Sequence, residues 1–318
     1  MRVTRGEFLG WVGKGLVALA LMKGAGRSGW AEQGSAVPAE LPKRPLGRTG
    51  HQVTLMSLGG EGILRTTGRM QQAVPVIRRA LELGINYFDT APAYQQSQDY
   101  LGEGLQGSRQ RIFLASKTHE RSRDGSLRLL DDSLRRLRTD HLDLWQLHDL
   151  REMEELEEIF SGDGAIRALE EAKAQGRVRF VGITGHTTPD VLIEAARRYP
   201  FDTALVSINP ADRVRLSFIE QFLPVAAEKG MGVIAMKVMA RGSLLEDPVR
   251  FTPAEAMGYA LGQPAVATAL IGCSTPAEVE QNAAAVARFQ ALTVAQLAEL
   301  EERVRPFAPR YSYFKRGS

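Results

Sequence analysis

The sequence predicts an α/β protein: one (β/α)8 TIM barrel, an amino-terminal β-hairpin that caps the barrel bottom, and an extra carboxyl-terminal helix. The chain has 318 residues, 44% of them apolar, which suits one such barrel. Eight short apolar runs typical of strands alternate with patterns typical of helices. The competing open doubly wound sheet is disfavoured, because Gly59-Gly60-Glu61-Gly62 is followed by no helix start and no acidic residue at the required offset.

The predicted elements begin with the hairpin. Arg44–Leu46 and Gln52–Leu58 flank a turn at Gly47–Gly50. Several of the strands that follow are almost entirely apolar, which is typical of parallel strands covered on both faces. The eight strand candidates are Met56–Gly59, Ile85–Asp89, Ile112–Ser116, Asp143–Leu147, Phe180–Thr184, Ala204–Ile208, Gly232–Met236 and Ala267–Ile271.

Between these strands, apolar residues recur at helical spacing. A last helix, at about Val294–Arg305, lies outside the repeat. The other helical patterns are Val74, Ile77 and Leu81 before a stop at Gly84; Leu127, Leu130, Leu134 and Leu137 after a cap-like Ser126; Ile166, Leu169 and Ala172 before Gly176; and the segments Pro189–Tyr199, Ser217–Gly230, Pro253–Leu261 and Pro276–Val286.

Residues 1–33 differ from the rest of the chain. A basic start, a short apolar stretch at Leu16–Met22 and small residues up to Ala31 have the layout of an export signal. Thr4–Leu9 resembles a twin-arginine (Tat) motif whose second arginine is glycine. Two interpretations stay open: a signal peptide for periplasmic export cleaved near Ala31, and a disordered extension of a cytoplasmic protein. Residues 34–42 are predicted to be a linker into the barrel, residues 43–318.

Composition narrows the classes of partner. The net charge is +3, from 40 basic and 37 acidic residues that are interspersed, so nucleic acid is not an expected partner. The apolar stretch at Leu16–Met22 is far shorter than the roughly twenty residues that span a bilayer, so no integral membrane segment is expected. The single cysteine, Cys273, excludes an intrachain disulfide, and the five histidines show no metal-ligand spacing, so no metal site is expected. The oligomeric state is not determined.

Polar residues at or just past the ends of three predicted strands carry the chemistry: Asp89, Tyr94, Lys117 and His148. In a parallel barrel such residues converge on one mouth. An ammonium beside a phenol lowers the phenol's pKa, a carboxylate holds the ammonium in place, and an imidazole can orient a carbonyl. No serine or cysteine lies in an activated context, so the nucleophile is expected to be hydride from a nicotinamide cofactor.

From about Arg44 to Asn282 the chain resembles the aldo/keto reductase family. The resemblance implies that Tyr94 is the general acid, that Lys117 and Asp89 tune it, and that His148 positions the carbonyl of a small-molecule substrate. The implied activity is the NADPH- or NADH-dependent reduction of an aldehyde or ketone to an alcohol. The motifs that carry the resemblance are PLGRTG (Pro45–Gly50), FDTAPAY (Phe88–Tyr94), LASKT (Leu114–Thr118), LDLWQLHD (Leu142–Asp149), VGITG (Val181–Gly185), GVIAMK (Gly232–Lys237) and IGCSTPAEVEQN (Ile271–Asn282).

The residues that would hold the cofactor depart more from the family pattern. Thr184-Gly185 and Leu205 replace the usual Ser-Asn and Gln, while Asn209 remains, and Met236 replaces the aromatic ring that stacks on the nicotinamide. The remaining positions follow the resemblance: Lys237 for a phosphate, Gly242, Ser243 and Leu244 in the loop around the pyrophosphate, Gly272, Cys273 and Ser274 near the adenosine phosphate, and Asn282 near the adenine.

Glu278 stands where many members carry arginine or glutamine. A carboxylate there would repel a ribose 2′-phosphate and accept hydrogen bonds from a free 2′-hydroxyl, which predicts less preference for NADPH than is usual in the family. The alternative is that Glu278 points to solvent at the start of a helix, where its charge suits the helix dipole.

Two other functions stay open. Lys117 could form a Schiff base in a lyase, although an adjacent Asp89 would keep the amine charged and unreactive. The barrel could also be a non-catalytic, nicotinamide-binding regulatory subunit, since several nicotinamide contacts are replaced. The sequence does not identify the substrate: the loop after the fourth strand, Arg151–Glu158, is acidic, which is typical of a solvated helix face.

Overall fold

The computed structural model describes residues 40–315. The predicted export signal at residues 1–33 and most of the linker at residues 34–42 therefore lie outside the described part of the chain. At the linker's end, Leu41 is buried, and the carbonyl of Pro42 accepts a hydrogen bond from the amide of Leu55 at 2.9 Å.

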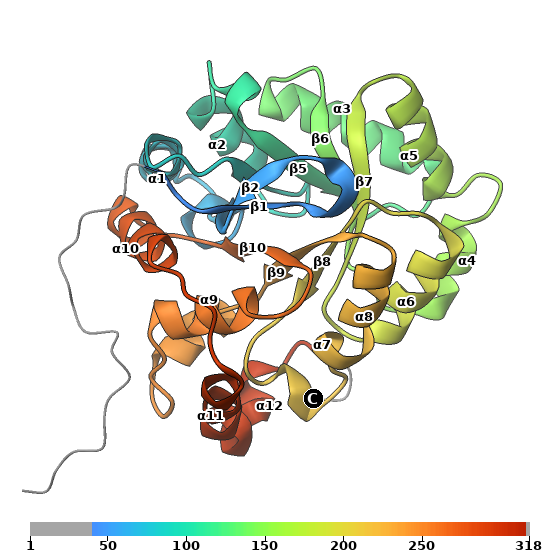
Figure 1. Ribbon diagram of the computed structural model, residues 1–318. Helices are drawn as coiled ribbons and strands as arrows, with labels where there is room; N and C mark the ends of the chain where they lie inside the picture. The colour runs from blue at the N-terminus through green and yellow to red at the C-terminus, as the bar shows by residue number, and fades with distance from the viewer. Residues whose placement is uncertain (1–39, 316–318) are drawn as a thin grey trace, which may run out of the picture. The chain divides into compact units, whose positions relative to one another are not determined.

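Eight parallel strands close into a barrel, in the order β10-β3-β4-β5-β6-β7-β8-β9 (Figure 1). The predicted TIM barrel is confirmed, and each strand overlaps the run predicted for it. The register pairs Asp89 of β4 with Ala115 of β5, and Lys117 of β5 with Gln146 of β6, so these side chains come to the same end of the barrel. The strands are β3 Met56–Gly59, β4 Tyr87–Asp89, β5 Phe113–Thr118, β6 Leu142–Leu147, β7 Val178–Gly185, β8 Thr203–Ser207, β9 Gly232–Met236 and β10 Val266–Ile271.

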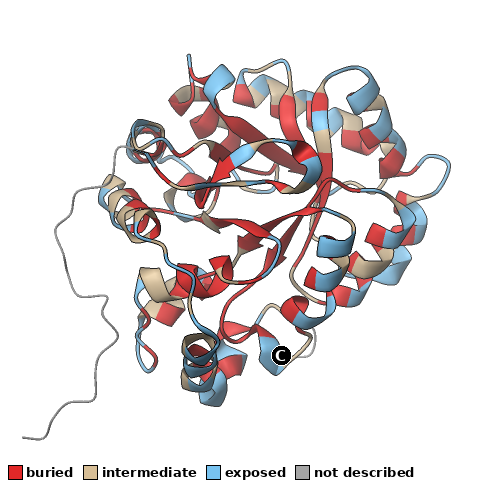
Figure 2. Cartoon of the chain, in the orientation of Figure 1, coloured by how far each residue is buried: buried red, intermediate tan, exposed pale blue. Residues whose placement is uncertain are grey.

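Helices surround the barrel and bury their inner faces against it, as the red strands and inward-facing turns of Figure 2 show. The apolar positions at helical spacing are the ones that turn inward, because burying apolar side chains away from water stabilises the folded state. The helices are α1 Met70–Glu82, α2 Ser97–Gly104, α3 Arg123–Leu137, α4 Met153–Ile159, α5 Ala165–Ala174, α6 Pro189–Arg198, α7 Phe218–Gln221, α8 Leu223–Glu228, α9 Pro253–Leu261, α10 Pro276–Ala287, α11 Val294–Val304 and α12 Ala308–Tyr311.

The hairpin of β1 (Lys43–Pro45) and β2 (Gln52–Thr54) closes the amino-terminal end of the barrel, as predicted. Leu46 and Val53 are fully buried and pack in a cluster with Tyr87 of the barrel interior. Gly47 has φ +51°, and a Cβ there would lie 2.1 Å from the amide nitrogen of Gly232. Only glycine therefore lets this turn rest directly on the start of β9.

Three details of the helices differ from the prediction. Helix α3 is capped by Ser122, whose hydroxyl accepts from the amide of Gly125, so Ser126 lies inside the helix. The segment predicted as one helix from Ser217 to Gly230 is two short helices, α7 and α8, with Pro224 in the first turn of the second. Helix α2 had no clear apolar periodicity to reveal it, because its inner face also buries polar side chains such as Gln98. Gln98 donates to the hydroxyls of Ser116 on β5 and Ser133 on α3.

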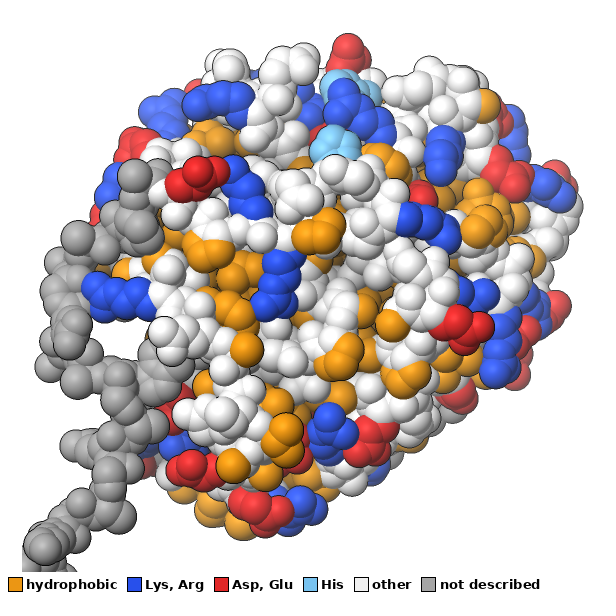
Figure 3. Space-filling view, viewed as in Figure 1, with side chains coloured by type: hydrophobic (Ala, Val, Ile, Leu, Met, Phe, Trp, Pro, Cys, Tyr) orange, Lys and Arg blue, Asp and Glu red, His pale blue; other side chains and the backbone are white. Residues whose placement is uncertain are grey.

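The outer surface mixes both signs of charge. On the face seen in Figure 3, basic and acidic side chains lie among one another without a stripe of one sign. Within residues 40–315, no helix is at once long enough and apolar enough to cross a membrane.

Candidate functional site

The four predicted catalytic residues lie together at the carboxyl end of the barrel. Asp89 is the last residue of β4 and Tyr94 lies in the loop that follows it. Lys117 is the fifth of the six residues of β5, and His148 comes directly after β6. The structure thus brings the four side chains to one mouth, because parallel strands all end on the same side of a barrel.

Lys117 and Asp89 form a buried ion pair beneath this mouth. The Lys117 ammonium contacts the Asp89 carboxylate and donates a hydrogen bond to the carbonyl of Thr90 at 2.8 Å. Gln146 Nε2 donates to the other Asp89 oxygen at 3.0 Å. Burial raises the pKa of Asp89 and lowers the pKa of Lys117, while their direct contact opposes both effects by favouring the charged forms.

Tyr94 lies between this ion pair and His148. The Lys117 ammonium is 4.9 Å from the centre of the Tyr94 ring, and the His148 ring meets the same ring edge-on, with 5.7 Å between centroids. The predicted lowering of the Tyr94 pKa by Lys117 is wrong for the protein on its own. Burial and the nearby carboxylates of Asp89 and Glu61 raise this pKa, since Asp89 compensates the ammonium charge. The phenol is therefore fully protonated at neutral pH.

His148 is neutral over the physiological range. Burial, together with the positive charge of Lys117, lowers the pKa of His148 to about 3. A neutral imidazole carries one N–H donor, so His148 can hydrogen-bond a carbonyl oxygen but holds no spare proton to transfer. The backbone amide of His148 donates to the carbonyl of Thr118 at 2.8 Å, which fixes the start of this loop against β5.

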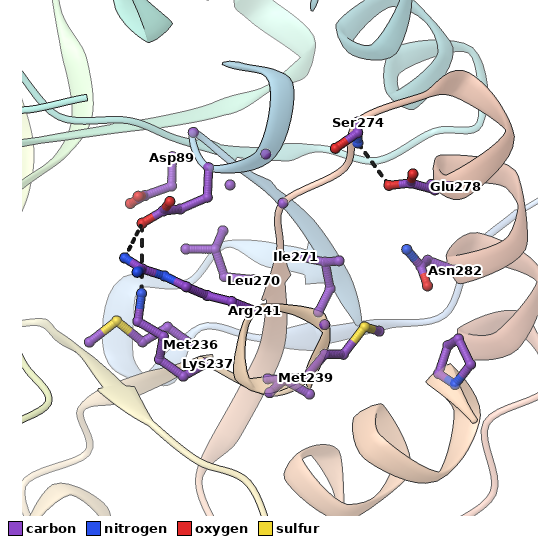
Figure 4. A pocket seen from close by; sticks show the side chains of 18 of the residues that line it. Asp89, Met236, Lys237, Met239, Arg241, Leu270, Ile271, Ser274, Glu278 and Asn282 are labelled. Carbon is purple, nitrogen blue, oxygen red and sulfur yellow. Dashed lines mark hydrogen bonds and ion pairs between the residues drawn. The ribbon is translucent and has the colours of Figure 1, made fainter. Parts of the chain in front are cut away.

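Two cavities meet at Tyr94. The first, of about 420 Å³, runs from the Asp89 and Tyr94 end to helix α10 (Figure 4). Its middle carries the cations Lys237 and Arg241. Seven of the predicted cofactor residues line this first cavity: Met236, Lys237, Gly242, Gly272, Ser274, Glu278 and Asn282.

The other predicted cofactor residues are used elsewhere. The Cys273 thiol is buried and accepts from Asn282 Nδ2 at 3.6 Å. Thr184 lines the second cavity, where its hydroxyl accepts from the amide of Asp149 at 2.7 Å. Asn209 is buried, and its side-chain amide donates to the carbonyls of Lys237 and Tyr311, so it braces the chain behind the first cavity. The hydroxyl of Ser243 donates to the carbonyl of Ala240 at 2.7 Å. Leu244 packs in the apolar core, because the loop turns its side chain inward.

Glu61 is a site residue that the motifs did not identify. Its carboxylate accepts from Arg65 at 2.9 Å and lies 3.7 Å from both Lys237 Nζ and Arg241 Nη2. The dashed lines on the left of Figure 4 mark the last two contacts. Burial raises the pKa of Glu61, but Lys237, Arg65 and Arg241 together outweigh burial and hold it below its ordinary value. The position of Glu61 in the sequence could have indicated a role in the site, since it lies two residues past the end of β3.

Glu278 lies in the first turn of α10, is half-buried, and folds its carboxylate back over the loop before the helix. Its Oε2 accepts from the amide of Ser274 at 2.8 Å, as Figure 4 shows, and its own amide donates to the Thr275 hydroxyl at 3.2 Å. The negative charge of Glu278 therefore lies next to the Ser274 amide, at the end of the first cavity near α10.

The second cavity, of about 460 Å³, opens beside His148. Its walls come largely from residues just past the ends of β5, β6 and β7, namely His119, Arg121, Asp149, Arg151, Glu155 and His186. Asp149 ends the LDLWQLHD motif, and Arg151 and Glu155 belong to the acidic loop, but the sequence analysis gave none of these six residues a role in the site. Their position could have indicated one for His119, Asp149 and His186, which lie one or two residues past the ends of β5, β6 and β7.

Comparisons with known proteins show which family the barrel resembles. The model of the aldo/keto reductase family matches residues 55–257, a stretch that contains all four residues of the mouth. L-galactose dehydrogenase of Arabidopsis thaliana is 31% identical, over 84% of this chain and 95% of that protein. Methylglyoxal reductase YeaE of Escherichia coli is 28% identical, over 72% of this chain and 83% of that protein. The holo form of the aldo-keto reductase AKR11C1 from Bacillus halodurans superposes with a TM-score of 0.70 at 29% identity, over 84% of this chain and 96% of that one.

Proposed function

Because this chain belongs to the aldo/keto reductase family and is an NAD(P)-dependent oxidoreductase, we propose that it reduces an aldehyde or ketone to an alcohol with Tyr94 as the proton donor. The observation that carries this proposal is the position of Tyr94. Tyr94 lines both cavities where they meet and lies next to the His148 imidazole. The centre of its ring is 4.9 Å from Lys117 Nζ. A carbonyl held in the second cavity would thus meet both a proton donor and the first cavity.

The first cavity fits a nicotinamide dinucleotide. Lys237 and Arg241 share a single carboxylate, Glu61, in the middle of the cavity, which leaves positive charge where a pyrophosphate would lie. Arg241 and Gly242 have φ +59° and +91°, a backbone turn that glycine makes possible at the cavity edge. Met236 would pack on the nicotinamide, while Ser274 and Asn282 would hold the adenosine end. When bound, the reduced cofactor supplies hydride to the carbonyl carbon.

The chain's own residues supply the proton and the electrostatics. The neutral His148 donates a hydrogen bond to the carbonyl oxygen and so fixes its place in front of Tyr94. The Tyr94 hydroxyl gives its proton to that oxygen as negative charge develops on it. The phenolate left behind is stabilised by the Lys117 ammonium, which Asp89 and the Thr90 carbonyl hold at a fixed place.

The Schiff-base alternative has less support. Lys117 has 0% of its side chain exposed, and two of its donors are held by Asp89 and Thr90, so the amine is neither free nor neutral enough to attack a carbonyl. Trapping of a substrate on Lys117 with borohydride would favour the lyase.

Steady-state kinetics of Tyr94→Phe test the proposed reduction. Removing the hydroxyl is expected to lower kcat for carbonyl-dependent NAD(P)H oxidation by roughly a hundredfold to ten-thousandfold, the usual contribution of a general acid. Cofactor binding, followed by fluorescence titration, should be nearly unchanged. Tyr199→Phe, at the end of α6, is the matched control and should retain activity.

Undiminished turnover by Tyr94→Phe would contradict the assignment of the proton donor. A native protein that binds NADH or NADPH yet oxidises neither with any carbonyl compound would instead indicate the non-catalytic, regulatory function.

A further inference from the structure

The loop after β3 packs directly on the ring of Tyr94. A Cβ on Gly60 would lie 3.0 Å from Tyr94 Cδ2 and 2.6 Å from Ser97 Oγ, so only glycine lets the backbone come this close. The amide of Ser97 donates to the Tyr94 carbonyl at 2.9 Å, which holds the loop of Tyr94 on the start of α2. The ring of Tyr94 is therefore confined between two anchored segments of backbone.

The same loop brings a cation over this ring. The guanidinium carbon of Arg65 is 5.2 Å from the centre of the Tyr94 ring, a distance at which the face of an aromatic ring attracts a positive charge. The residues on both sides of Arg65 are anchored. Leu64 is fully buried, and the carbonyl of Thr66 accepts from the Tyr100 hydroxyl at 2.8 Å. The backbone thus holds Arg65 at a defined place over the phenol.

Arg65 shares its carboxylate with two other cations. Arg65 Nη1 donates to Glu61 at 2.9 Å, and the same carboxylate lies 3.7 Å from both Lys237 Nζ and Arg241 Nη2. Burial and nearby carboxylates, Glu61 among them, raise the pKa of Tyr94, and Arg65 opposes them. The positive charge of Arg65 is therefore only partly compensated where it acts on the phenol.

The other cation beside the ring has a carboxylate of its own. Lys117 Nζ is 4.9 Å from the ring centre and contacts Asp89 directly, so this pair has no net charge. The Lys117 ammonium alone thus cannot balance the negative charge that Tyr94 acquires when it loses a proton. Arg65 is placed to supply the difference from outside the buried pair.

We propose that Arg65 is a positioning residue of the reduction, and that it acts through Tyr94 by stabilising the phenolate left after proton transfer. This inference rests on the proposed function, because it assumes that Tyr94 is the proton donor. When the hydroxyl gives its proton to the substrate oxygen, the electron pair of the O–H bond stays on Tyr94, and its negative charge spreads into the ring. A cation over the ring is attracted more strongly by this anion than by the neutral phenol. Arg65 therefore stabilises the transition state more than it stabilises the bound substrate.

Single-turnover kinetics of Arg65→Gln and Arg65→Lys in the full chain test this role. The rate is followed as the loss of NAD(P)H absorbance with methylglyoxal, or with whichever carbonyl compound the native protein reduces faster. Arg65→Gln removes the charge and is expected to be about tenfold slower than the native protein, the usual scale of a cation held on an aromatic ring. Arg65→Lys keeps the charge but not the planar group, and should stay within about threefold of the native rate.

The same substitution in a Tyr94→Phe background separates an effect through the phenol from a general effect on the site. No phenolate forms there, so Arg65→Gln is expected to lower the remaining rate by less than about twofold. Arg78→Gln, at an exposed position on α1, is the matched control and should leave the native rate unchanged. Arg65→Met, which also lacks the charge, takes the place of Arg65→Gln if that variant does not fold.

A native rate in Arg65→Gln would overturn the inference, as would equal losses in Arg65→Gln and Arg65→Lys. A loss of about tenfold from Arg65→Gln in the Tyr94→Phe background would overturn it too, because the guanidinium would then act without the phenol. Absence of carbonyl-dependent NAD(P)H oxidation by the native protein, or undiminished turnover by Tyr94→Phe alone, would instead count against the proposed function itself.

Discussion

Tyr94 and His148 differ in what their surroundings do to their protons. Both lose solvation, but burial keeps the phenol protonated and keeps the imidazole neutral. In the proposed reduction, the Tyr94 phenol can therefore give up a proton, whereas the neutral His148 imidazole can only donate a hydrogen bond. The different roles that we propose for the two groups follow from their burial as well as from their residue types.

The neutral state of His148 gives a prediction on stability against pH. Its pKa falls from an ordinary 6.5 to about 3 in the folded protein. Between these values the unfolded chain binds more protons at this position than the folded chain does, so the free energy of unfolding falls as the pH is lowered from about 6.5 towards 3. Above pH 6.5 this contribution is constant.

Urea unfolding from pH 8 to pH 4 measures this effect. In His148→Gln the decline of the free energy of unfolding with falling pH should be shallower than in the native protein. Gln106→Asn, which changes an exposed side chain that does not titrate, is the control and should keep the native slope. Identical slopes for all three proteins would contradict the neutral imidazole.

Glu278 gives a prediction on cofactor choice. Its carboxylate covers the Ser274 amide, where a ribose 2′-phosphate would meet it, so the native protein is expected to prefer NADPH over NADH by much less than a hundredfold. Glu278→Arg should raise the ratio of kcat/KM with NADPH to that with NADH at least tenfold, and Glu278→Gln by a smaller factor. A hundredfold preference for NADPH in the native chain would rule out this role for Glu278.

At the scale of elements, the loop after β3 and the loop after β9 face each other across the first cavity. Glu61 in one loop compensates Lys237 and Arg241 in the other. A bound pyrophosphate would compete with this carboxylate for the same two cations. The contact thus costs some affinity for the cofactor while it keeps two neighbouring positive charges from repelling each other.

Glu61→Gln is expected to lower the dissociation constant of NADH and of NADPH severalfold, since the two cations are then available to the phosphates. Fluorescence titration at low and at high salt measures both the affinity and its dependence on ionic strength. Glu82→Gln, an exposed carboxylate on α1, is the matched control. Weaker binding by Glu61→Gln would show that the carboxylate instead organises the loop for the cofactor.

For the molecule as a whole, a buried ion pair between Lys315 and Asp212 ties the end of the described chain to the barrel. Lys315 is 3% exposed and donates to Asp212 Oδ1 at 2.7 Å, to the Asp212 carbonyl at 2.8 Å and to the Arg215 carbonyl at 2.8 Å. Asp212 also accepts from the Ser217 hydroxyl and the Ile219 amide, so it links this end to the start of α7.

Lys315→Met is expected to lower the free energy of unfolding by about 3–5 kcal/mol, because it leaves the Asp212 carboxylate buried without its cation. Urea unfolding at pH 7 measures this change. Lys229→Met, at a partly exposed position just past α8, is the control and should change the stability by less than about 0.5 kcal/mol. A loss as small as that of the control would mean that Asp212 is adequately solvated without Lys315.

The export signal predicted for residues 1–33 and the cytoplasmic alternative stay predictions, since those residues lie outside the described part of the chain. Amino-terminal sequencing of the mature protein distinguishes them. Cleavage near Ala31 is expected if the chain is exported.

The barrel and its mouth could be predicted from the amino-acid sequence. Strands buried on both faces must be apolar throughout, and residues that follow their carboxyl ends must meet at one side, so Asp89, Tyr94, Lys117 and His148 could be brought together from their positions alone. The sequence did not reveal α2, whose buried face mixes polar and apolar side chains. It also did not reveal the true cap of α3, because caps depend on which of several nearby hydroxyls reaches the free amides.

The charge states of these residues, and the neighbours that complete the site, follow from the folded structure and could not be predicted from the sequence. The pKa of Tyr94 and of His148 depends on burial, and burial depends on packing that no local pattern encodes. Glu61 meets Lys237 and Arg241 from the opposite side of the first cavity, while Asp149 meets His186 across neighbouring strands. Such pairings join residues far apart in the chain, and their distances are set only when the barrel closes.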